Sequence, residues 1–200
     1  DHGYFPALAV GEQETVPEVH SWERRQPAAV TLGTVYDEWC LGNIAQALGD
    51  KKEADYFLKR SLNYHKIFNK ETCFFHPKDS FGNFIQPFDY RYSSGVGGRD
   101  AYDENNGWVY RWDLPHNVAD LVNMMGGKER FVEELERMYS TPLGKGRPDF
   151  HHQFGDHTGN VGQFSMGNEP AMHIPYLYNY AGQPWRTQKR VRNLLTQWFR

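Results

Sequence analysis

The sequence lacks the features that mark several large classes of protein. It contains only two cysteines, Cys40 and Cys73, in 200 residues, and a disulfide scaffold of this size would need more. Two buried free thiols are therefore expected rather than one bridge. No apolar run approaches the roughly 20 residues that a membrane span needs. The net charge of −3 is small and no basic stripe is present, which argues against nucleic acid as the main partner.

The motifs of several enzyme classes are also absent. There is no G-x-S-x-G, no P-loop and no dinucleotide fingerprint. Because H-E-x-x-H and paired Cys/His spacings are missing, the histidines and acids around residues 149–157 are expected to form a solvated loop rather than a metal site. The loops supply enough Asp, Glu and Asn for an oxygen-ligand ion such as Ca²⁺. No EF-hand pattern places its ligands, so the metal-binding residues stay unknown.

Aromatic side chains are abundant instead. They make up 16% of the chain, with 6 Trp and 12 Tyr. Such side chains fill a hydrophobic core, and their flat rings also form platforms on which sugar rings lie. The composition therefore permits a carbohydrate site without requiring one.

Apolar residues at helical spacing predict six helices. The first begins at Pro27 and is closed by Gly49. Asp50 is expected to cap the second, because Glu53 stands where a capping box has its reciprocal partner, and residues 27–69 thus predict a helical hairpin. The other four helices are expected over about residues 117–125, 128–139 and 170–180 and from residue 184 onward.

Two long connections separate these helices. Residues 70–106 contain a turn at residues 79–83, whose flanking aromatic and apolar residues could form a small β-hairpin. Residues 141–164 are rich in Gly, His and Asp. Connections this long in a compact domain are usually functional. With no exact repeat and no alternating series of strands, the pattern predicts an all-α fold of helical hairpins joined by long loops.

Both ends of the sequence are unusual for a complete domain. Asp1 is not an initiator methionine, and no signal-peptide pattern is present. Residues 194–199 still follow an amphipathic helical pattern where the sequence stops. We therefore expect residues 1–200 to be part of one larger domain that is truncated at both ends.

A first acidic cluster lies at the end of the first long connection. Glu104 is followed by Asn106 and Trp108. Glycoside hydrolysis needs a carboxylic acid that protonates the leaving oxygen, and a tryptophan that shields a glutamate from water favours its protonated form. The plain alternative is a solvated loop acid beside a core tryptophan.

A second cluster has the same form. Asn168 and Glu169 precede Pro170, which suits the first turn of a helix because its missing N–H would have no partner there. Glu169 would then stand at the positive end of the helix dipole, backed by His173 and by tyrosines. The pattern predicts either a sugar site or a cap followed by an aromatic core helix. The recurrence of carboxylate, amide and aromatic residues in both clusters favours the sugar site.

These segments resemble glycoside hydrolase family 92, the calcium-dependent exo-acting α-mannosidases. Residues 103–117 resemble the family's E-G-N-A-W-Q-Y-x-W-x-x-P-H-D segment, and residues 167–185, which begin G-N-E-P, resemble a second hallmark. Residues 5–7, 14–19 and 36–40 look similar as well. The resemblance implies an inverting enzyme that removes terminal mannose from glycans, with Ca²⁺ as cofactor and a secreted or periplasmic location.

The resemblance also implies roles for individual residues. Glu104 would be the general acid, and Trp108 would shape and desolvate it. The residues expected to contact the sugar are Asn106, His116, Asn168, Glu169 and His173. Asn168 stands where α-1,2-specific members tend to have His, and residues 105–107 depart from the family's G-N-A, so the linkage preference is not assigned.

The fold implied by the resemblance is an (α/α)₆ barrel that follows an N-terminal β-sandwich. This chain resembles roughly the middle of that barrel, so its helices would form a partial toroid whose partner is the missing remainder of its own catalytic domain. The family's general base is an Asp in a G-N-x-D-x-G segment, which this sequence does not contain. The chain would carry the general-acid half of the site, with some Ca²⁺ ligands outside it, and would turn over little by itself.

Two other functions are left as alternatives. Another (α/α)-toroid sugar enzyme, such as an epimerase, would convert its substrate without hydrolysis. A non-catalytic carbohydrate-binding helical module would keep its affinity for glycans when the Glu104 carboxyl is removed. The paired motifs favour the mannosidase over both.

Overall fold

The computed structural model describes residues 2–21, 24–91, 101–143 and 158–199. The chain divides into two compact units, Asp1–His116 and Asn117–Arg200. Helices dominate both units, and the strands named within the described residues form two short antiparallel hairpins. The prediction of an all-α fold is therefore confirmed as a mostly helical architecture, with short strands that it did not include.

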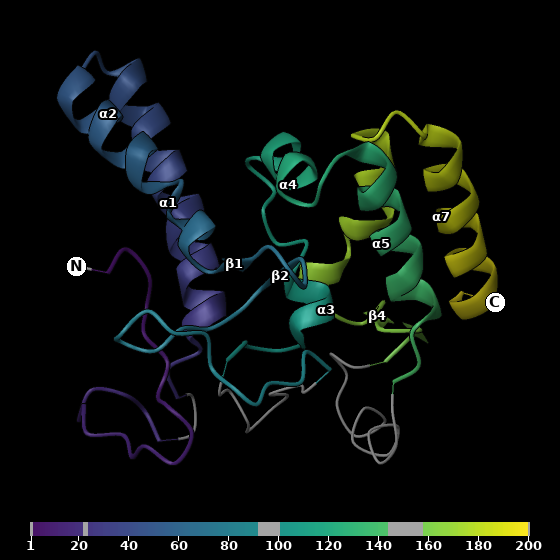
Figure 1. Ribbon diagram of the computed structural model, residues 1–200. Coiled ribbons are helices and arrows are strands. Elements are labelled where there is room, and N and C mark those ends of the chain that lie inside the picture. Colours follow the sequence, from purple (N-terminus) through teal and green to yellow (C-terminus); the bar gives the residue numbers. More distant parts are fainter. Residues whose placement is uncertain (1, 22–23, 92–100, 144–157, 200) are drawn as a thin grey trace. The chain divides into compact units, whose positions relative to one another are not determined.

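Helices α1 and α2 form the expected hairpin in the first unit (Figure 1). Helix α1 spans Pro27–Ala47 and α2 spans Lys51–Arg60. The Asp50 side chain accepts a hydrogen bond from the Glu53 N–H at 3.1 Å, as a capping residue does. Helix α2 is shorter than expected, because the 3₁₀ helix η1 (Asn63–Lys66) takes over the end of the segment.

The connection after η1 contains two hairpin-like features. Strand β1 (Phe68–Asn69) pairs antiparallel with β2 (Phe74–Phe75). The predicted turn further on is closed by a single bridge between Lys78 and Phe84, so that hairpin is present in its shortest form. Helix α3 (Gly107–Tyr110) follows later in the chain and packs against β2.

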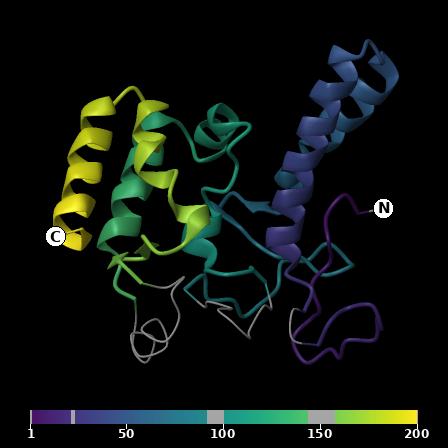
Figure 2. The same cartoon turned by 180° about the vertical axis from the view of Figure 1, so that it is seen from behind.

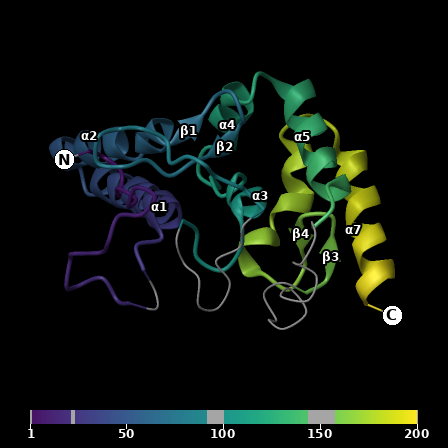
Figure 3. The same ribbon diagram turned by 60° about the horizontal axis from the view of Figure 1, so that its bottom comes forward.

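Three helices of the second unit lie where the sequence predicts them. They are α4 (Val118–Met124), α5 (Lys128–Ser140) and α7 (Pro184–Trp198). Helices α5 and α7 run side by side (Figure 1 and Figure 2). Strands β3 (Asn160–Val161) and β4 (Phe164–Ser165) form a hairpin near the C-terminal end of α5 (Figure 3).

The segment expected as one helix over residues 170–180 consists of two 3₁₀ helices. Helix η3 spans Glu169–Ala171 and η4 spans Ile174–Asn179. Pro170 does occupy the first turn, as expected. Pro175 explains the interruption, because inside an α-helix its ring would clash with the preceding turn and it has no N–H to donate. The prediction of a continuous α-helix is wrong at this point.

The structure bears on two features that are scarce in the sequence, cysteines and long apolar segments. Cys40, which is half-buried, and Cys73, which is buried, are both free thiols. Among the described residues, no helix combines the length and the apolar character that crossing a bilayer requires.

Candidate functional site

Glu104 lies in the turn that leads into helix α3. Its side chain is half-buried, and the two asparagines that follow are buried. The Asn106 N–H donates to Asn105 Oδ1 at 2.8 Å, and the Trp108 N–H donates to Asn106 Oδ1 at 3.0 Å. Asn106 therefore caps α3 by accepting from an N–H that has no partner within the helix. The amide-rich sequence fixes the backbone immediately after the carboxylate.

Tyr110 lies among the acidic residues of the same segment. Burial raises the pKa of its hydroxyl, and the charges of Asp103, Asp113 and Glu104 raise it further, against a hydrogen bond with the Glu104 backbone. Its ring stacks on Tyr102, with centroids 5.4 Å apart. Burial and the charges of three acidic residues thus favour the neutral phenol.

Trp108 packs in an aromatic group around a buried arginine. Its ring meets Phe74 edge-on, with centroids 5.1 Å apart. The guanidinium carbon of Arg111 lies 4.0 Å from the ring centre of Phe74, and 5.5 and 5.0 Å from those of Trp108 and Trp112. Arg111 is fully buried, and a desolvated cation on aromatic faces is a favourable contact. This group holds α3 against β2.

His116 lies among three aromatic rings from α1 and η1. The ring centroids of Tyr36, Trp39 and Tyr64 are 5.9, 5.9 and 5.8 Å from that of His116. Burial lowers the pKa of the imidazole, which favours its neutral form. A neutral ring beside a partly exposed tryptophan and tyrosine combines polar atoms with an apolar face, as a sugar contact does.

The second acidic segment follows strand β4. Asn168 is fully buried, whereas Glu169 is exposed. The Ala171 N–H donates to the Asn168 carbonyl at 3.0 Å and the Met172 N–H to the Glu169 carbonyl at 3.1 Å. These bonds form η3 and leave the Glu169 carboxylate at the surface. His173, which is half-buried, follows at the start of η4.

A cluster of charges ties η4 to helices α5 and α7. The Tyr178 hydroxyl donates to Glu136 Oε1 at 2.9 Å. Arg186 and Arg190 donate to the same carboxylate at 3.0 and 2.8 Å, and the Arg190 guanidinium lies 3.8 Å from the centre of the Tyr139 ring. One carboxylate thus holds the 3₁₀ segment to both helices.

The seven predicted site residues divide between the two units. The first unit holds Glu104, Asn106, Trp108 and His116, and the second holds Asn168, Glu169 and His173. Glu104 and Asn106 lie in the turn into α3 and Trp108 lies in α3 itself, whereas His116 packs against Tyr36 and Trp39 of α1. The three in the second unit lie at or beside η3. Their roles in binding and catalysis are proposals.

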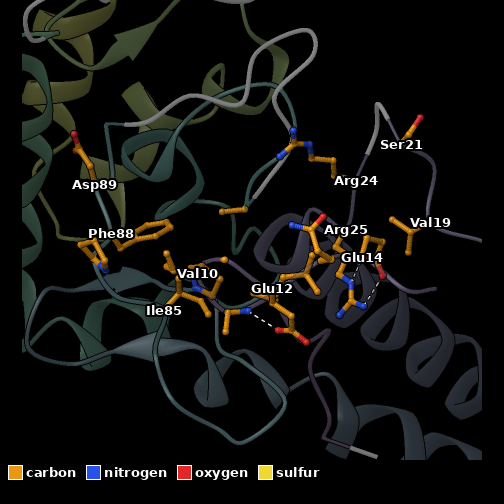
Figure 4. A pocket seen from close by; sticks show the side chains of 18 of the residues that line it. Val10, Glu12, Glu14, Val19, Ser21, Arg24, Arg25, Ile85, Phe88 and Asp89 are labelled. Atoms are coloured by element: carbon orange, nitrogen blue, oxygen red, sulfur yellow. Dashed lines mark hydrogen bonds and ion pairs between the residues drawn. The ribbon is translucent and has the colours of Figure 1, made fainter. Parts of the chain in front are cut away.

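The first unit also contains a cavity of about 820 Å³, between the N-terminal segment and the residues that follow β2 (Figure 4). Arg25 donates two hydrogen bonds to Glu14 there, at 2.6 and 2.8 Å, and these lower the pKa of Glu14 to about 2. Val10, Ile85 and Phe88 contribute apolar surface. None of the seven predicted site residues is among the described residues that line it.

The described residues do not assemble a metal site. Over residues 2–21, 24–91, 101–143 and 158–199, no three His, Cys, Asp or Glu side chains lie close enough to hold an ion. The histidines and acidic residues at positions 149–157, which the sequence analysis considers as possible metal ligands, lie outside the described residues. Among the described residues, no cluster of these side chains therefore marks where Ca²⁺ would bind.

The sequence does not reveal the residues that support the acid segment. His76 and Tyr90 form a hydrogen-bonded pair, and Arg111 fills the aromatic group. A charged residue between Tyr110 and Trp112 is a usable signal for a stacked arginine. The pairing of His76 with Tyr90 carries no such signal, because it joins residues that only the folded connection brings together.

Comparison with known proteins agrees with the fold and with the segments described above. The sequence model of the glycosyl hydrolase family 92 catalytic domain matches residues 1–200. A curated protein of Arthroderma benhamiae, an uncharacterized secreted glycosidase, is 27% identical over 219 residues, which cover 98% of this chain and 24% of that protein.

Solved structures of family GH92 enzymes from Bacteroides thetaiotaomicron are similar as well. The α-mannosidase BT3965 in complex with mannoimidazole matches with a TM-score of 0.78 and 28% identity, over 99% of this chain and 24% of that one. The inverting mannosidase BT2199 matches with a TM-score of 0.72 and 31% identity, over 98% of this chain and 24% of that one. The chain thus spans 24% of the length of these relatives, and it belongs to glycosyl hydrolase family 92, whose catalytic-domain model it matches over residues 1–200.

Proposed function

We propose that this chain supplies the general-acid half of an inverting exo-α-mannosidase site, which releases terminal α-linked mannose from glycans. The observation that carries the proposal is the turn into α3, where the half-buried Glu104 precedes a capped helix backed by aromatic rings. The family membership supports a glycoside hydrolase. The two solved relatives are mannosidases, and one of them is described as inverting.

In the proposed reaction Glu104 donates its proton to the glycosidic oxygen as the bond to the anomeric carbon breaks. A water molecule attacks the opposite face of the sugar and a second carboxylate takes its proton. The Asn106 cap and the buried Trp108 fix the backbone after Glu104, and a general acid depends on such fixed geometry. The second carboxylate is proposed to lie outside this chain.

The second unit is proposed to hold the sugar. The exposed carboxylate of Glu169 accepts hydrogen bonds from sugar hydroxyls, and Asn168 and His173 are the further proposed polar contacts. The proposed contacts from the first unit are Asn106, Trp108 and His116. A mannose-containing glycan is therefore the proposed partner.

The surroundings of the site are proposals of the same kind. Residues 1–200 are proposed to be part of one (α/α)₆ toroid, whose other helices and general base come from the remainder of the domain. Ca²⁺ is proposed as cofactor, and when bound it would supply positive charge to sugar hydroxyls. No cluster among the described residues marks its site, so no step above depends on it. The relative named a secreted glycosidase supports a secreted or periplasmic location.

The first test is release of mannose from a panel of α-linked mannobiosides, with and without EDTA. It compares this chain with the complete catalytic domain that contains it. Release by the complete domain alone, abolished by EDTA and restored by Ca²⁺, is expected. A folded complete domain that binds mannobiosides without cleaving them contradicts the proposal and favours a binding module, whereas conversion of the sugar without hydrolysis favours an epimerase.

The second test removes the proposed acid. Glu104→Gln should lower kcat on a mannobioside by about 10²–10⁴-fold, because the sugar leaving group departs poorly without a proton. An activated dinitrophenyl α-mannoside should lose far less, since its leaving group needs no proton. Glu71→Gln, at an exposed position of the same unit, is the matched control and should change neither rate. Equal losses on both substrates would contradict a general-acid role.

A further inference from the structure

A chain of hydrogen bonds runs through the connection that precedes the acid segment. Thr72 Oγ1 lies 2.9 Å from the Tyr90 hydroxyl, and that hydroxyl lies 2.8 Å from His76 Nδ1. His76 Nε2 lies 2.8 Å from the carbonyl oxygen of Ile85. The amide nitrogen of Asn69 approaches the same Nδ1 at 3.4 Å. Three groups thus meet at a single imidazole, and Thr72 is linked to it through the Tyr90 hydroxyl.

The directions of these bonds follow from the chemistry of the last acceptor. The Ile85 carbonyl can only accept, so Nε2 of His76 carries a proton. Burial lowers the pKa of His76, which favours the neutral ring, and Nδ1 then accepts. The Tyr90 hydroxyl therefore donates to Nδ1, and Thr72 donates to the Tyr90 oxygen. Each group has one defined role, so the chain holds Tyr90 in one orientation.

Ring packing fixes the same tyrosine from another side. The Tyr90 ring stacks on Phe74, with centroids 4.0 Å apart and an interplanar angle of 15°. Phe74 in turn contacts Trp108 and Arg111. Tyr90 is therefore held both by its hydroxyl and by its ring face.

The backbone at Tyr90 holds the start of helix α3. The Gly107 N–H donates to the Tyr90 carbonyl at 2.9 Å, and Asn106 Nδ2 donates to the neighbouring Arg91 carbonyl at 3.4 Å. The approach is close enough that a Cβ on Gly107 would lie 3.2 Å from Tyr90 Cβ. The backbone carbonyls of Tyr90 and Arg91 thus hold Gly107 and Asn106, which follow Glu104 closely in the chain.

We propose that Tyr90 and His76 are positioning residues for Glu104, acting through the Tyr90 carbonyl on Gly107 and so on the turn that carries the acid. Neither residue touches the glycosidic oxygen in this scheme. The inference rests on the proposed role of Glu104 as the proton donor. The inference goes further than that role: it makes the position of the Glu104 carboxyl depend on the hydrogen bond between Tyr90 and His76, which lie in a different segment of the chain.

The test is Tyr90→Phe in the complete catalytic domain, which keeps the stacked ring and removes the hydroxyl. A misplaced acid should lower kcat on a mannobioside by about tenfold, with KM nearly unchanged. The rate on dinitrophenyl α-mannoside should stay near wild type, because that leaving group needs no proton. A merely structural role would lower both rates together through loss of folded enzyme, and that result overturns the inference.

Matched variants separate the hydroxyl from general effects. Tyr4→Phe removes another tyrosine hydroxyl from the same unit, one that donates to the Asp79 carbonyl at 2.8 Å, and should not change the ratio of the two rates. Thr72→Val should lower the mannobioside rate as Tyr90→Phe does, while Thr72→Ser should restore it. If Thr72→Val and Thr72→Ser behave alike, the chain of hydrogen bonds is not what positions the acid.

Failure of the proposed function has a different signature. If Glu104→Gln keeps the full mannobioside rate, then Glu104 is not the acid and the inference falls with it. If Glu104→Gln loses that rate while Tyr90→Phe keeps it, only the inference falls. Amide hydrogen exchange gives a readout without turnover, since the Gly107 N–H should exchange about tenfold faster in Tyr90→Phe and not in Tyr4→Phe. Unchanged exchange would overturn the proposed link.

Discussion

The two acidic segments share a composition but are held in different ways. The segment around Glu104 is enclosed, with Asn105 and Asn106 each 1% exposed and Trp108 5% exposed. Around Glu169 the backbone forms short 3₁₀ turns, and Met172 is 55% exposed. Side-chain amides fix the first segment, whereas backbone hydrogen bonds and the neighbouring helices fix the second.

The difference matches the demands of the proposed chemistry. Proton transfer loses much of its rate when the donor moves by a fraction of its hydrogen-bond length, so an acid benefits from an enclosed turn. A carboxylate that accepts hydrogen bonds from a sugar must stay accessible, and Glu169 is exposed. Mutations that loosen one segment without the other test whether this division is real.

The largest effect is expected from Gly162→Ala, behind the second segment. Gly162 has φ +59°, and a Cβ there would lie 2.5 Å from the Met138 carbonyl oxygen and 2.6 Å from backbone atoms of Tyr139. Strain and overlap with helix backbone should together cost about 3 kcal/mol or more. Amide exchange of peptides from the second unit measures the loss.

A matched glycine separates strain from overlap in that experiment. Gly182 has φ +77° but no atom within 4 Å of its Cβ position, so Gly182→Ala should cost only about 1–2 kcal/mol. Equal losses for the two variants would mean that the β3–β4 hairpin does not press against α5 in solution.

The next effect is expected from Gly107→Ala, inside the first segment. A Cβ there would lie 2.8 Å from the Tyr102 hydroxyl oxygen and 3.2 Å from Tyr90 Cβ. The Tyr102 hydroxyl is held by its hydrogen bond to the Phe75 carbonyl and Tyr90 by its stacked ring, so the overlap should cost about 1–3 kcal/mol. Exchange should rise in peptides of the first unit and not of the second. Gly33→Ala, in α1 with no atom within 4 Å, should instead stabilise by about 0.5–1 kcal/mol.

These glycines also show how far the sequence could predict the structure. The helices with clear periodicity and caps, such as α1 and the Asp50 cap of α2, follow from local pattern. The helix break at Pro175 is equally local, because a proline inside the expected helix is itself a signal for an interruption. The packing that makes Gly107 necessary brings it against two tyrosines, Tyr90 and Tyr102. Sequence spacing cannot reveal such an approach, because it depends on how the connection folds.

The same limit applies to the candidate site. Glu104, Asn106 and Trp108 could be proposed from the sequence because they are neighbours in it. The contact of Tyr178 with Glu136 could not be foreseen, since 42 positions separate the two residues and Glu136 stands in no recognised motif. Residues that bind or react are thus easier to find than residues that support them.

A smaller effect is expected from Glu136→Gln, which weakens the support of the second segment. Glutamine keeps an oxygen for the Tyr178 hydroxyl but removes the charge that faces Arg186 and Arg190. Because the Glu136 side chain is 39% exposed, water screens these pairs, and the loss should be about 1 kcal/mol. Exchange in η4 should rise. Glu133→Gln, on the exposed side of α5, should change stability by less than about 0.5 kcal/mol; an equal loss there would show that the charge cluster has no special role.

The smallest effect is expected from a change of pH, which should affect the support of the first acidic segment through protonation of His76 and leave the second segment unchanged. Burial lowers the pKa of His76 below its ordinary value of 6.5, so the folded chain resists protonation that the unfolded chain accepts. The stabilisation from the neutral ring is therefore complete above pH 6.5 and is lost as the pH falls from there through the lower pKa of the folded state. His116 shifts in the same direction. On mild acidification, exchange should rise first in the residues around Tyr90 and Gly107. A ring titration of His76 by NMR should give a midpoint below 6.5; a midpoint above it would mean that a charged ring donates to Tyr90, which reverses the chain of hydrogen bonds on which the position of the acid is proposed to depend.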